Sequence, residues 1–550
     1  MSAADRLRRA GRRAGLGTAD RGDSPPVSAT LASAAVAVAV VSPVLWILLR
    51  AADVGVDSAV ALLARPAMVD ILLNSVALVA TVTVACVLLG VPLAVLTVQT
   101  DLPFRRFWTV VLALPLVVPS YIGAFAFVSA FGPRGALADA LAPLGVESIP
   151  QIYGFGGTAL VLTLYVYPYV FLTTRAALLS FDGTLVEAAR TLNHSRRAAF
   201  RRVTLPQIAP GVAAGALLVA LYTLSDFGTP SIMHFGVFTR AIYVEFNTFG
   251  RDTAALLSLE LLAVTAVIVA LESRVGGRDS GSYAGGGRSA APTPLGAWKV
   301  PALLFCALVA ALALVVPLGV LAMWLVRSGP GYAGGGFAFE WTYGLNSAYV
   351  SALAAAVATL AAVPVAYLAG RYRSSLTSLF DRATYVGYAT PGIVLGISLV
   401  YFGSSYVPAL YQTIPLLVFA YVVRFLPQAV GTTRSSVLQV DAELVEAART
   451  LGRPPGEAFR RVTLPLIAPG VVAGAALVFL TTMKELPATL LLRPTGFETL
   501  VTYIWRVQEA GYYGQAAVPA LALVGVSALS MLVLLRQDGG LVRREGGTDD

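Results

Sequence analysis

Few residues in this 550-residue chain are of the kinds that do chemistry. It holds two histidines and two cysteines, and only 13% of its residues are charged. So few imidazole and thiol groups exclude most zinc sites and most histidine-based catalytic designs. No glycine-rich phosphate loop followed by Lys-Ser or Lys-Thr occurs, which excludes a P-loop nucleotide site. We predict no catalytic residue, no metal site and no cofactor in this chain.

The ionisable residues of most interest lie in or beside long apolar segments. A charge within the hydrocarbon costs at least about 2.5–3.5 kcal/mol, so such residues usually face a pathway or a partner. The pathway candidates are Asp226, Glu260, Arg424, Lys484 and Glu485. Glu260 and Arg424 are either structural partners or pathway residues. Lys484 and Glu485 either line a pathway or extend to the membrane interface.

The elements that position these charges are apolar helices, since 57% of the residues are hydrophobic. A soluble domain has about 45–50% apolar and about 25% charged residues, so a single soluble domain is excluded. The predicted fold class is an all-α polytopic membrane protein. A membrane-spanning helix needs about 20 mostly apolar residues. This rule predicts twelve spans, near 29–49, 71–98, 107–131, 156–174, 207–228, 253–271, 300–326, 345–369, 379–402, 413–433, 466–483 and 515–535.

Basic residues predict the orientation of these spans. With the N-terminus inside, 29 of the 39 lysines and arginines fall on the cytoplasmic side, as the positive-inside rule requires. We therefore expect a multi-pass protein of the cell membrane with both termini cytoplasmic. The net charge of +9 marks topology in the lipid bilayer, and no nucleic-acid partner is expected.

A Gly-rich stretch divides the chain into two halves of six spans. The predicted organisation is a cytoplasmic tail, a first transmembrane half, a flexible cytoplasmic linker, a second transmembrane half and a short cytoplasmic tail. Their boundaries are 1–28, 29–271, 272–299, 300–535 and 536–550.

The two halves are copies of each other. Residues 187–215 match 446–474 at 21 of 29 positions, and Asn74-Ser75 matches Asn346-Ser347. Two parallel six-helix repeats of this kind are expected to pack about an axis along the membrane normal. The strongest match falls in a cytoplasmic loop, which indicates a docking surface more than a connector.

Local rules predict a helix–turn–helix in each copy of this loop, which we call an elbow. Asp182 and Asp441 can cap a short helix, and Gly452 or Asn193 can turn the chain in a left-handed conformation. Ser195 or Pro454 can start a second short helix. We expect that helix to end at Pro206 or Pro465, where the next span begins. An elbow that only anchors to lipid headgroups is the plainer alternative.

This loop resembles the signature of type I ABC importer permeases, in which Glu-Ala-Ala, three residues, Gly and a spacer precede Leu-Pro. The resemblance covers about 70–271 and 341–535, and the fused form is similar to ferric-iron permeases and their thiamine-importer relatives. It implies that each elbow is a coupling helix, that two ATPase subunits dock there, and that an extracytoplasmic solute-binding protein delivers cargo. Asn193 departs from the usual Gly. The implied coupling residues are Glu187, Ala188, Ala189, Asn193, Leu205, Pro206, Glu446, Ala447, Ala448, Gly452, Leu464 and Pro465.

The cargo rests on the ends of two equivalent spans. The segments 225–230 and 484–494, particularly the second, resemble the ferric-iron permeases. Ferric iron is therefore the favoured cargo, with thiamine, polyamine or another small solute as alternatives.

The sequence gives less support to two other classes of function. Inverted repeats or charged residues at mid-membrane would favour an ion-coupled secondary transporter. This repeat is parallel, and its best match is a loop. An intramembrane enzyme would need a constellation of catalytic residues, and none is visible.

Overall fold

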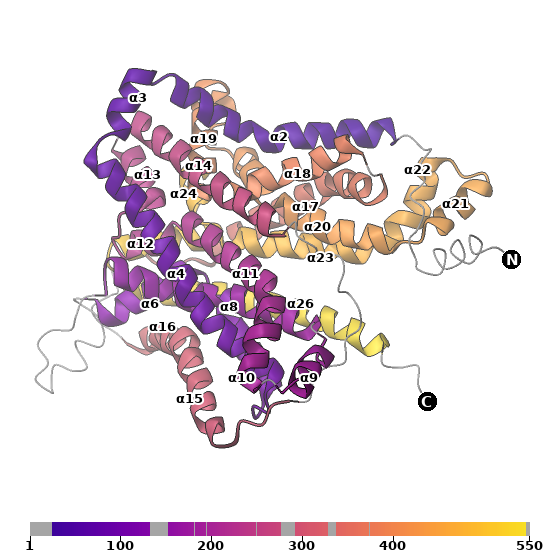
Figure 1. Cartoon of the computed structure of the whole chain (residues 1–550). Coiled ribbons are helices and arrows are strands. Elements are labelled where there is room, and N and C mark those ends of the chain that lie inside the picture. The colour runs from indigo at the N-terminus through magenta and orange to yellow at the C-terminus, as the bar shows by residue number, and fades with distance from the viewer. Residues whose placement is uncertain are drawn as a thin grey trace, which may run out of the picture. The chain divides into compact units, whose positions relative to one another are not determined.

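The computed structural model describes residues 25–132, 152–180, 182–193, 195–248, 250–276, 292–327, 337–372 and 374–545. In this part of the chain the regular secondary structure is helical (Figure 1). The β-pairing found in these residues is one isolated bridge, between Thr100 and Thr293. The predicted all-α architecture is confirmed.

Nine helices in the described residues are long and apolar enough to cross a membrane, and two bent helix pairs raise that number to eleven. The predicted polytopic character is therefore confirmed. The twelfth predicted span falls in α26 (Tyr513–Glu545), whose described apolar part, Tyr513–Leu529, is shorter. The nine spans are α2 (Val27–Ala52), α4 (Pro66–Gln99), α8 (Phe155–Ser180), Phe200–Ser225, Arg251–Leu271, Gly296–Val326, α17 (Trp341–Arg371), α20 (Ile414–Gln439) and Pro455–Met483.

The predictions of single uninterrupted spans at 107–131 and 379–402 are wrong. In the first copy, the helix pair α5 (Arg105–Ala113) and α6 (Ser120–Phe131) is bent by 89°. The second copy breaks in the same way between α18 (Ser375–Ala389) and α19 (Gly392–Ser405). Pro119 and Pro391 stand at the two breaks. Proline interrupts a helix because it lacks a backbone N–H donor and keeps the preceding residue out of the helical region.

The helices form two compact units, and these units interleave the two halves of the sequence. The first unit joins residues 1–45, 348–388 and 412–483. Its core includes Ala37 of α2, packed with Leu368 of α17 and Phe380 of α18. Its other helices are α20, α21 (Ala442–Thr450), α22 (Pro455–Ala458), η7 (Phe459–Thr463) and α23 (Leu464–Met483).

The second unit joins residues 46–347, 389–411 and 484–550, so it combines most of the first half with helices from the second. Within it, Gly396 of α19 packs so closely on α24 (Pro487–Leu492) that an added Cβ would lie 2.7 Å from Leu491 Cδ1. Its further helices are α3 (Val56–Leu63), α9 (Thr184–Thr191), α10 (Arg196–Ala199), η3 (Phe200–Thr204), α11 (Leu205–Ser225), α12 (Gly228–Ile232), α13 (Phe238–Asn247), α14 (Arg251–Gly276), α15 (Lys299–Ala310), α16 (Val316–Val326), α24 (Pro487–Leu492) and α25 (Leu500–Glu509).

The end of the predicted linker is held against the end of α4. Lys299 Nζ lies 2.8 Å from Asp101 Oδ2, and the Leu295 backbone N–H donates to Asp101 Oδ1 at 2.8 Å. The Thr293 N–H also donates to the Gln99 carbonyl. Residues 277–291 of the predicted linker lie outside the described residues.

Candidate functional site

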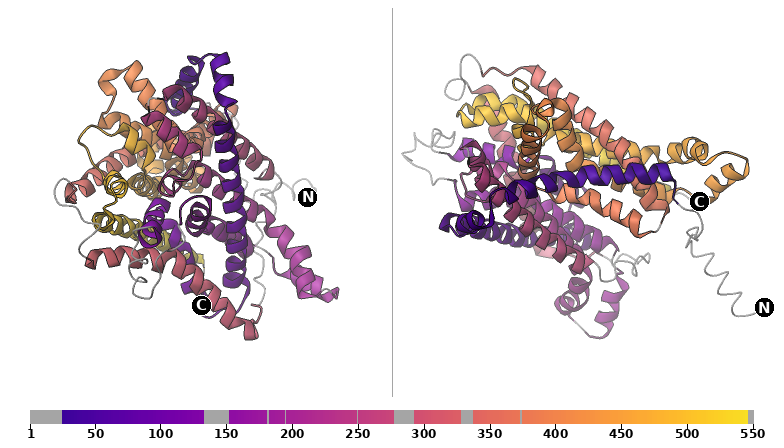
Figure 2. Two further views of the ribbon diagram at one scale, coloured as in Figure 1. Left: turned by 90° about the vertical axis from the view of Figure 1, so that its left-hand side faces the viewer. Right: turned by 90° about the horizontal axis from the view of Figure 1, so that it is seen from above.

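Each elbow connects two long helices of the same unit. The first elbow, residues 182–204, joins α8 to α11, and the second, residues 441–463, joins α20 to α23. The second elbow extends beyond the ends of α20 and α23 (Figures 1 and 2). We call the two long helices that carry an elbow its stems.

The aspartates cap the first short helix of each elbow, as predicted. Asp441 Oδ1 accepts from the Glu443 backbone N–H at 3.0 Å, and Asp182 Oδ1 accepts from the Thr184 N–H at the same distance. The second helices also start where the sequence indicates. Ser195 Oγ accepts from the Ala198 N–H at 3.3 Å, and Pro454 is the N-cap of α22.

The predicted left-handed turns are confirmed. Gly452 has φ of 81° and Asn193 has φ of 67°. Behind Gly452 the N–H groups of residues 452 and 453 donate to the carbonyls of Arg449 and Ala448, which is the Schellman arrangement. The Asn193 N–H donates in the same way to the Arg190 carbonyl, so asparagine occupies the left-handed position that Gly452 has in the second copy.

The prediction that Pro206 and Pro465 end the second short helix is wrong. Each helix continues into its stem through one five-residue π-helical turn, η3 or η7. The Leu205 N–H donates to the Phe200 carbonyl, and Leu464 donates to Phe459. A wider turn suits proline, because its ring would clash with the carbonyl four residues earlier in an α-helix. The second short helix of each elbow and the stem that follows it are thus one continuous helix.

The coupling residues implied by the sequence present a mixed surface. Ala189 is buried, whereas the acidic and alanine residues Glu187, Glu446, Ala188 and Ala447 are exposed; Ala448 is half-buried. Two matched leucines protrude strongly, Leu192 at 75% and Leu451 at 82% exposure. Leu205, Pro206, Leu464 and Pro465 are exposed at the starts of α11 and α23, and the turn residues Asn193 and Gly452 are exposed as well. An apolar side chain of this exposure, placed twice at equivalent positions, suits a partner surface.

Matched glycines lock the two stems of each elbow together. A Cβ on Gly215 of α11 would lie 2.3 Å from Thr173 Oγ1 of α8, and one on Gly474 of α23 would lie 2.5 Å from Thr432 Oγ1 of α20. Small residues allow such close approach between membrane helices. The two stems of each elbow are therefore closely packed against each other.

Two of the predicted pathway residues occupy equivalent places. Asp226 and Glu485, 9% and 6% exposed, follow the ends of α11 and α23. Asp226 Oδ1 accepts from the Thr229 N–H at 3.0 Å, and Glu485 Oε1 accepts from the Ala488 N–H at 3.1 Å. Each carboxylate thus caps the short helix that follows it, α12 or α24. Ser120 Oγ also donates to Asp226 Oδ2.

The other three pathway candidates are half-buried. Lys484 directly follows α23, and the Arg424 guanidinium lies 5.7 Å from the ring centroid of Phe425. Glu260 Oε2 is buried without a hydrogen-bond partner among the described residues. Those residues contain no group of three His, Cys, Asp or Glu that could hold a metal ion.

Sequence reasoning missed the purpose of the repeated Asn-Ser pairs. Asn74 Nδ2 donates to the Gly236 carbonyl at 3.1 Å, and Ser75 Oγ accepts from the Phe238 N–H at 3.1 Å. Asn346 and Ser347 make the same two bonds, to the Glu498 carbonyl and from the Leu500 N–H, both at 2.8 Å. We call each set of bonds a clamp. The clamps fix the starts of α13 and α25, and the repeated dipeptide was the signal for them.

Comparison with known proteins places both copies of this repeat in one family. The family model of the binding-protein-dependent transport system inner membrane component matches residues 86–328 and 362–544. The chain belongs to this family. It is a fused two-domain ABC-type permease, a multi-pass protein of the inner membrane.

The permease is similar to curated transport proteins over most of its length. It is 34% identical over 514 residues to the Fe(3+)-transport system permease protein FbpB 2 of Haemophilus influenzae, covering 93% of this chain and 98% of the relative. It is 29% identical to the probable ABC transporter permease protein y4fN of Sinorhizobium fredii, covering 89% and 90%. The molybdenum transport system permease protein ModB of Mycobacterium tuberculosis is 33% identical over 217 residues, 38% of this chain and 80% of that protein. The predicted resemblance to ferric transporters is confirmed, and these relatives are transport permeases, not enzymes.

Proposed function

We propose that this permease is the membrane-spanning subunit of an ATP-driven importer that moves ferric iron delivered by an extracytoplasmic binding protein. Two ATPase subunits would dock on the two elbows, which with both termini would face the cytoplasm. The observation that carries the proposal is the duplicated elbow with exposed Leu192 and Leu451, built on glycine-locked stems.

The geometry suggests how a partner would drive the permease. A partner that docks on an elbow would contact Glu187 or Glu446. Each lies near the start of a short helix, where a carboxylate interacts favourably with the helix dipole. Because elbow and stem are continuous through the π-helical turn, a displacement passes to α11 or α23 without an intervening loop. The paired stem follows, and one side of the pathway opens as the other closes.

The test reverses the charge at both elbows. Purified complexes with the Glu187→Lys, Glu446→Lys double substitution should insert normally but lose bound ATPase or lose transport while hydrolysis continues. Glu340→Lys is the matched control, because Glu340 is also exposed but lies just before α17, outside both elbows. Full ATPase attachment together with full transport in the double mutant would show that the elbows are not the coupling surface.

The orientation is tested separately by labelling. A cysteine in place of Gly281, within the basic inter-half segment, should resist an impermeant thiol reagent added outside intact cells. Ready labelling from outside would reverse the proposed topology.

The cargo proposal draws on the segment 484–494 and on the Haemophilus relative. The molybdenum permease matches only 38% of the chain and therefore supports the permease module more than a cargo. A strain without this protein should grow poorly when iron is scarce and should take up less ferric iron. Normal iron uptake with lost uptake of thiamine, polyamine or another small solute would transfer the assignment to that alternative.

A further inference from the structure

The two clamped helices, α13 and α25, stand at equivalent places in the repeat but differ in burial. Seven of the ten residues of α25 are buried, against three of the ten in α13. The buried residues of α13 are Phe238, Thr239 and Ile242, near its clamped start. Beyond them α13 is half-buried or exposed, so its second half buries less side-chain surface than its start.

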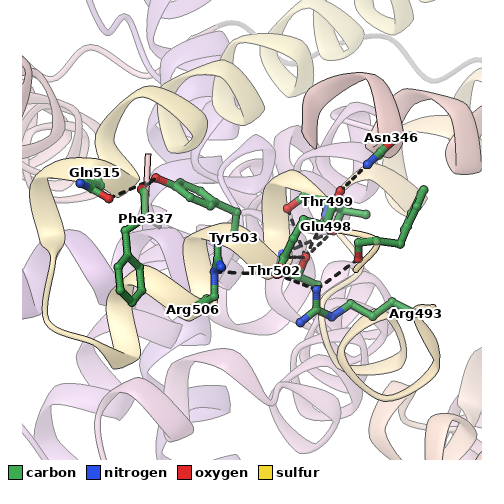
Figure 3. Close-up of polar contacts among 10 residues, drawn as sticks. Phe337, Asn346, Arg493, Glu498, Thr499, Thr502, Tyr503, Arg506 and Gln515 are labelled. Atoms are coloured by element: carbon green, nitrogen blue, oxygen red, sulfur yellow. Dashed lines mark hydrogen bonds and ion pairs between the residues drawn. The ribbon is translucent and has the colours of Figure 1, made fainter. Parts of the chain in front are cut away.

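Helix α25 is held by more than its clamp. Its start has a capping box between Thr499 and Thr502. Glu498 then binds two arginines, with Arg493 Nη1 at 2.7 Å and Arg506 Nε at 3.8 Å from Glu498 Oε1 (Figure 3). Thr502 Oγ1 donates to the other carboxylate oxygen at 2.8 Å.

Aromatic packing ties α25 to the start of α17. The rings of Tyr343 and Tyr503 stack with centroids 5.1 Å apart, and the Tyr503 hydroxyl donates to the Phe337 carbonyl. Arg506 lies over the rings of Phe337 and Tyr503, 5.5 Å from each centroid (Figure 3). In the first copy Gly236 stands where the second has Glu498, so the carboxylate that joins the two arginines has no counterpart there.

The two helices meet through three aromatic residues, which we call the aromatic seal. Phe227, directly after Asp226, lies 4.9 Å from Tyr243 of α13 and 5.1 Å from Trp505 of α25, measured between ring centroids. Tyr243 and Trp505 make an edge contact at 6.1 Å. Phe227 and Trp505 are 2% and 6% exposed. Helices from the two repeats therefore close on each other beside a buried carboxylate.

We propose that the aromatic seal is the outer gate of this permease, with α25 as its fixed side and α13 as its moving side. The inference rests on the proposed import function, and the positive-inside bias assigns these helices to the outer face. Opening would swing the second half of α13 about its clamp and separate Tyr243 from Trp505. The glutamate network would hold α25 on α17 throughout.

A reversible cross-link tests whether the seal must open. Tyr243→Cys and Trp505→Cys are combined in a chain with Cys86→Ala and Cys306→Ala, since both native cysteines are buried free thiols. A short bifunctional thiosulfonate is then applied to the full complex in proteoliposomes that contain the binding protein loaded with ferric iron. Cross-linking should reduce transport at least tenfold, and a reductant should restore it. Unchanged transport with a complete cross-link would overturn the proposal.

The matched control cross-links the fixed side. The pair Tyr343→Cys and Tyr503→Cys joins residues with a similar ring separation, but these are proposed to stay together through the cycle. Its cross-link should leave transport within about twofold of the untreated variant. Equal loss of transport in both pairs would show that α25 also moves, which contradicts the assignment of fixed and moving sides.

A second variant covers the case in which the cysteine pair does not assemble. Tyr243→Ala in the otherwise native chain should weaken the seal and raise ATP hydrolysis in the absence of loaded binding protein by about three- to tenfold. Idle hydrolysis and transport equal to those of the native complex would refute the gate. Attached ATPase is measured in every sample, so failure of the elbow proposal is distinguished from failure of the gate.

Discussion

The two elbows have similar backbone conformations, but they differ in the ion pairs that hold them, which we call braces. In the second, Glu457 lies 2.9 Å from both Arg453 and Arg461. The stem above it is tied by Arg434 Nη1 to Asp381 Oδ2 at 2.6 Å, and Arg371 donates to the Val440 carbonyl. At the matched positions the first copy has Ala198, Thr109 and Gln99 in place of Glu457, Asp381 and Arg371, so the two acidic partners are missing.

The same asymmetry recurs at α13 and α25, where Gly236 replaces Glu498. The two copies thus share the turns, caps and helix contacts that define the shape, whereas these particular acidic residues are found only in the second copy. Braces add stability locally without changing the fold, because each contributes little to the free energy of unfolding compared with helix packing. We expect the first copy to be the more compliant of the two.

The largest expected effect concerns the stem glycines, which both copies share. Gly215→Ala or Gly474→Ala places a methyl group 2.7 Å from Val170 Cα or 2.9 Å from Ala429 Cα, so the stems must separate. The cost should be roughly 1–3 kcal/mol of unfolding free energy in either copy. Thermal unfolding of the purified permease measures it, with Gly525→Ala as control because nothing lies within 4 Å of its added Cβ. A loss in only one copy would break the equivalence of the stems.

The next effect concerns the stem brace of the second copy. Asp381→Asn should cost about 1–2 kcal/mol, because Arg434 loses a charged acceptor while remaining partly solvated. The matched substitution Thr109→Asn in the first copy should change unfolding by less than about 0.5 kcal/mol. Equal losses at the two positions, measured by the same unfolding experiment, would remove the proposed asymmetry.

A smaller effect is expected from exchanging the elbow braces. Glu457→Ala should destabilise the second elbow by less than about 1 kcal/mol, since all three side chains are partly exposed. Ala198→Glu should stabilise the first by about 0.3–0.5 kcal/mol, because it places a glutamate four residues before Arg202 on a helix. Rates of tryptic cleavage in the elbow loops report both. Faster cleavage in Ala198→Glu would contradict the brace.

The smallest effect is the pH response of a brace outside the elbows. The hydrogen bond from Lys299 lowers the pKa of Asp101 below its ordinary value. A carboxyl with a lowered pKa stabilises the folded state above its unfolded pKa and loses that contribution as pH falls through the folded pKa. The protection factor of the Leu295 amide, which corrects hydrogen exchange for the intrinsic pH dependence of the rate, should therefore fall below about pH 4, and Asp101→Asn should remove this fall. A protection factor that stays constant with pH in the native chain would show that this contact carries no charge dependence.

Sequence reasoning succeeded where a local rule applied. The caps at Asp182 and Asp441 and the left-handed turns at Asn193 and Gly452 follow from side-chain reach and backbone sterics over a few residues. It failed at Pro119, Pro391, Pro206 and Pro465. A proline removes the same hydrogen bond everywhere, but whether the helix breaks or widens into a π-helical turn depends on what packs around it.

The sequence alone determined the all-helical membrane fold, the duplication and the elbow, because hydropathy, repeat identity and capping are properties of the chain itself. Only the tertiary structure decided that helices of the second half join the unit holding most of the first, and that Asn74 and Asn346 clamp α13 and α25. It alone brought Phe227, Tyr243 and Trp505 together. Contacts between residues hundreds of positions apart leave no periodic trace in the chain, because they depend on how whole helices pack.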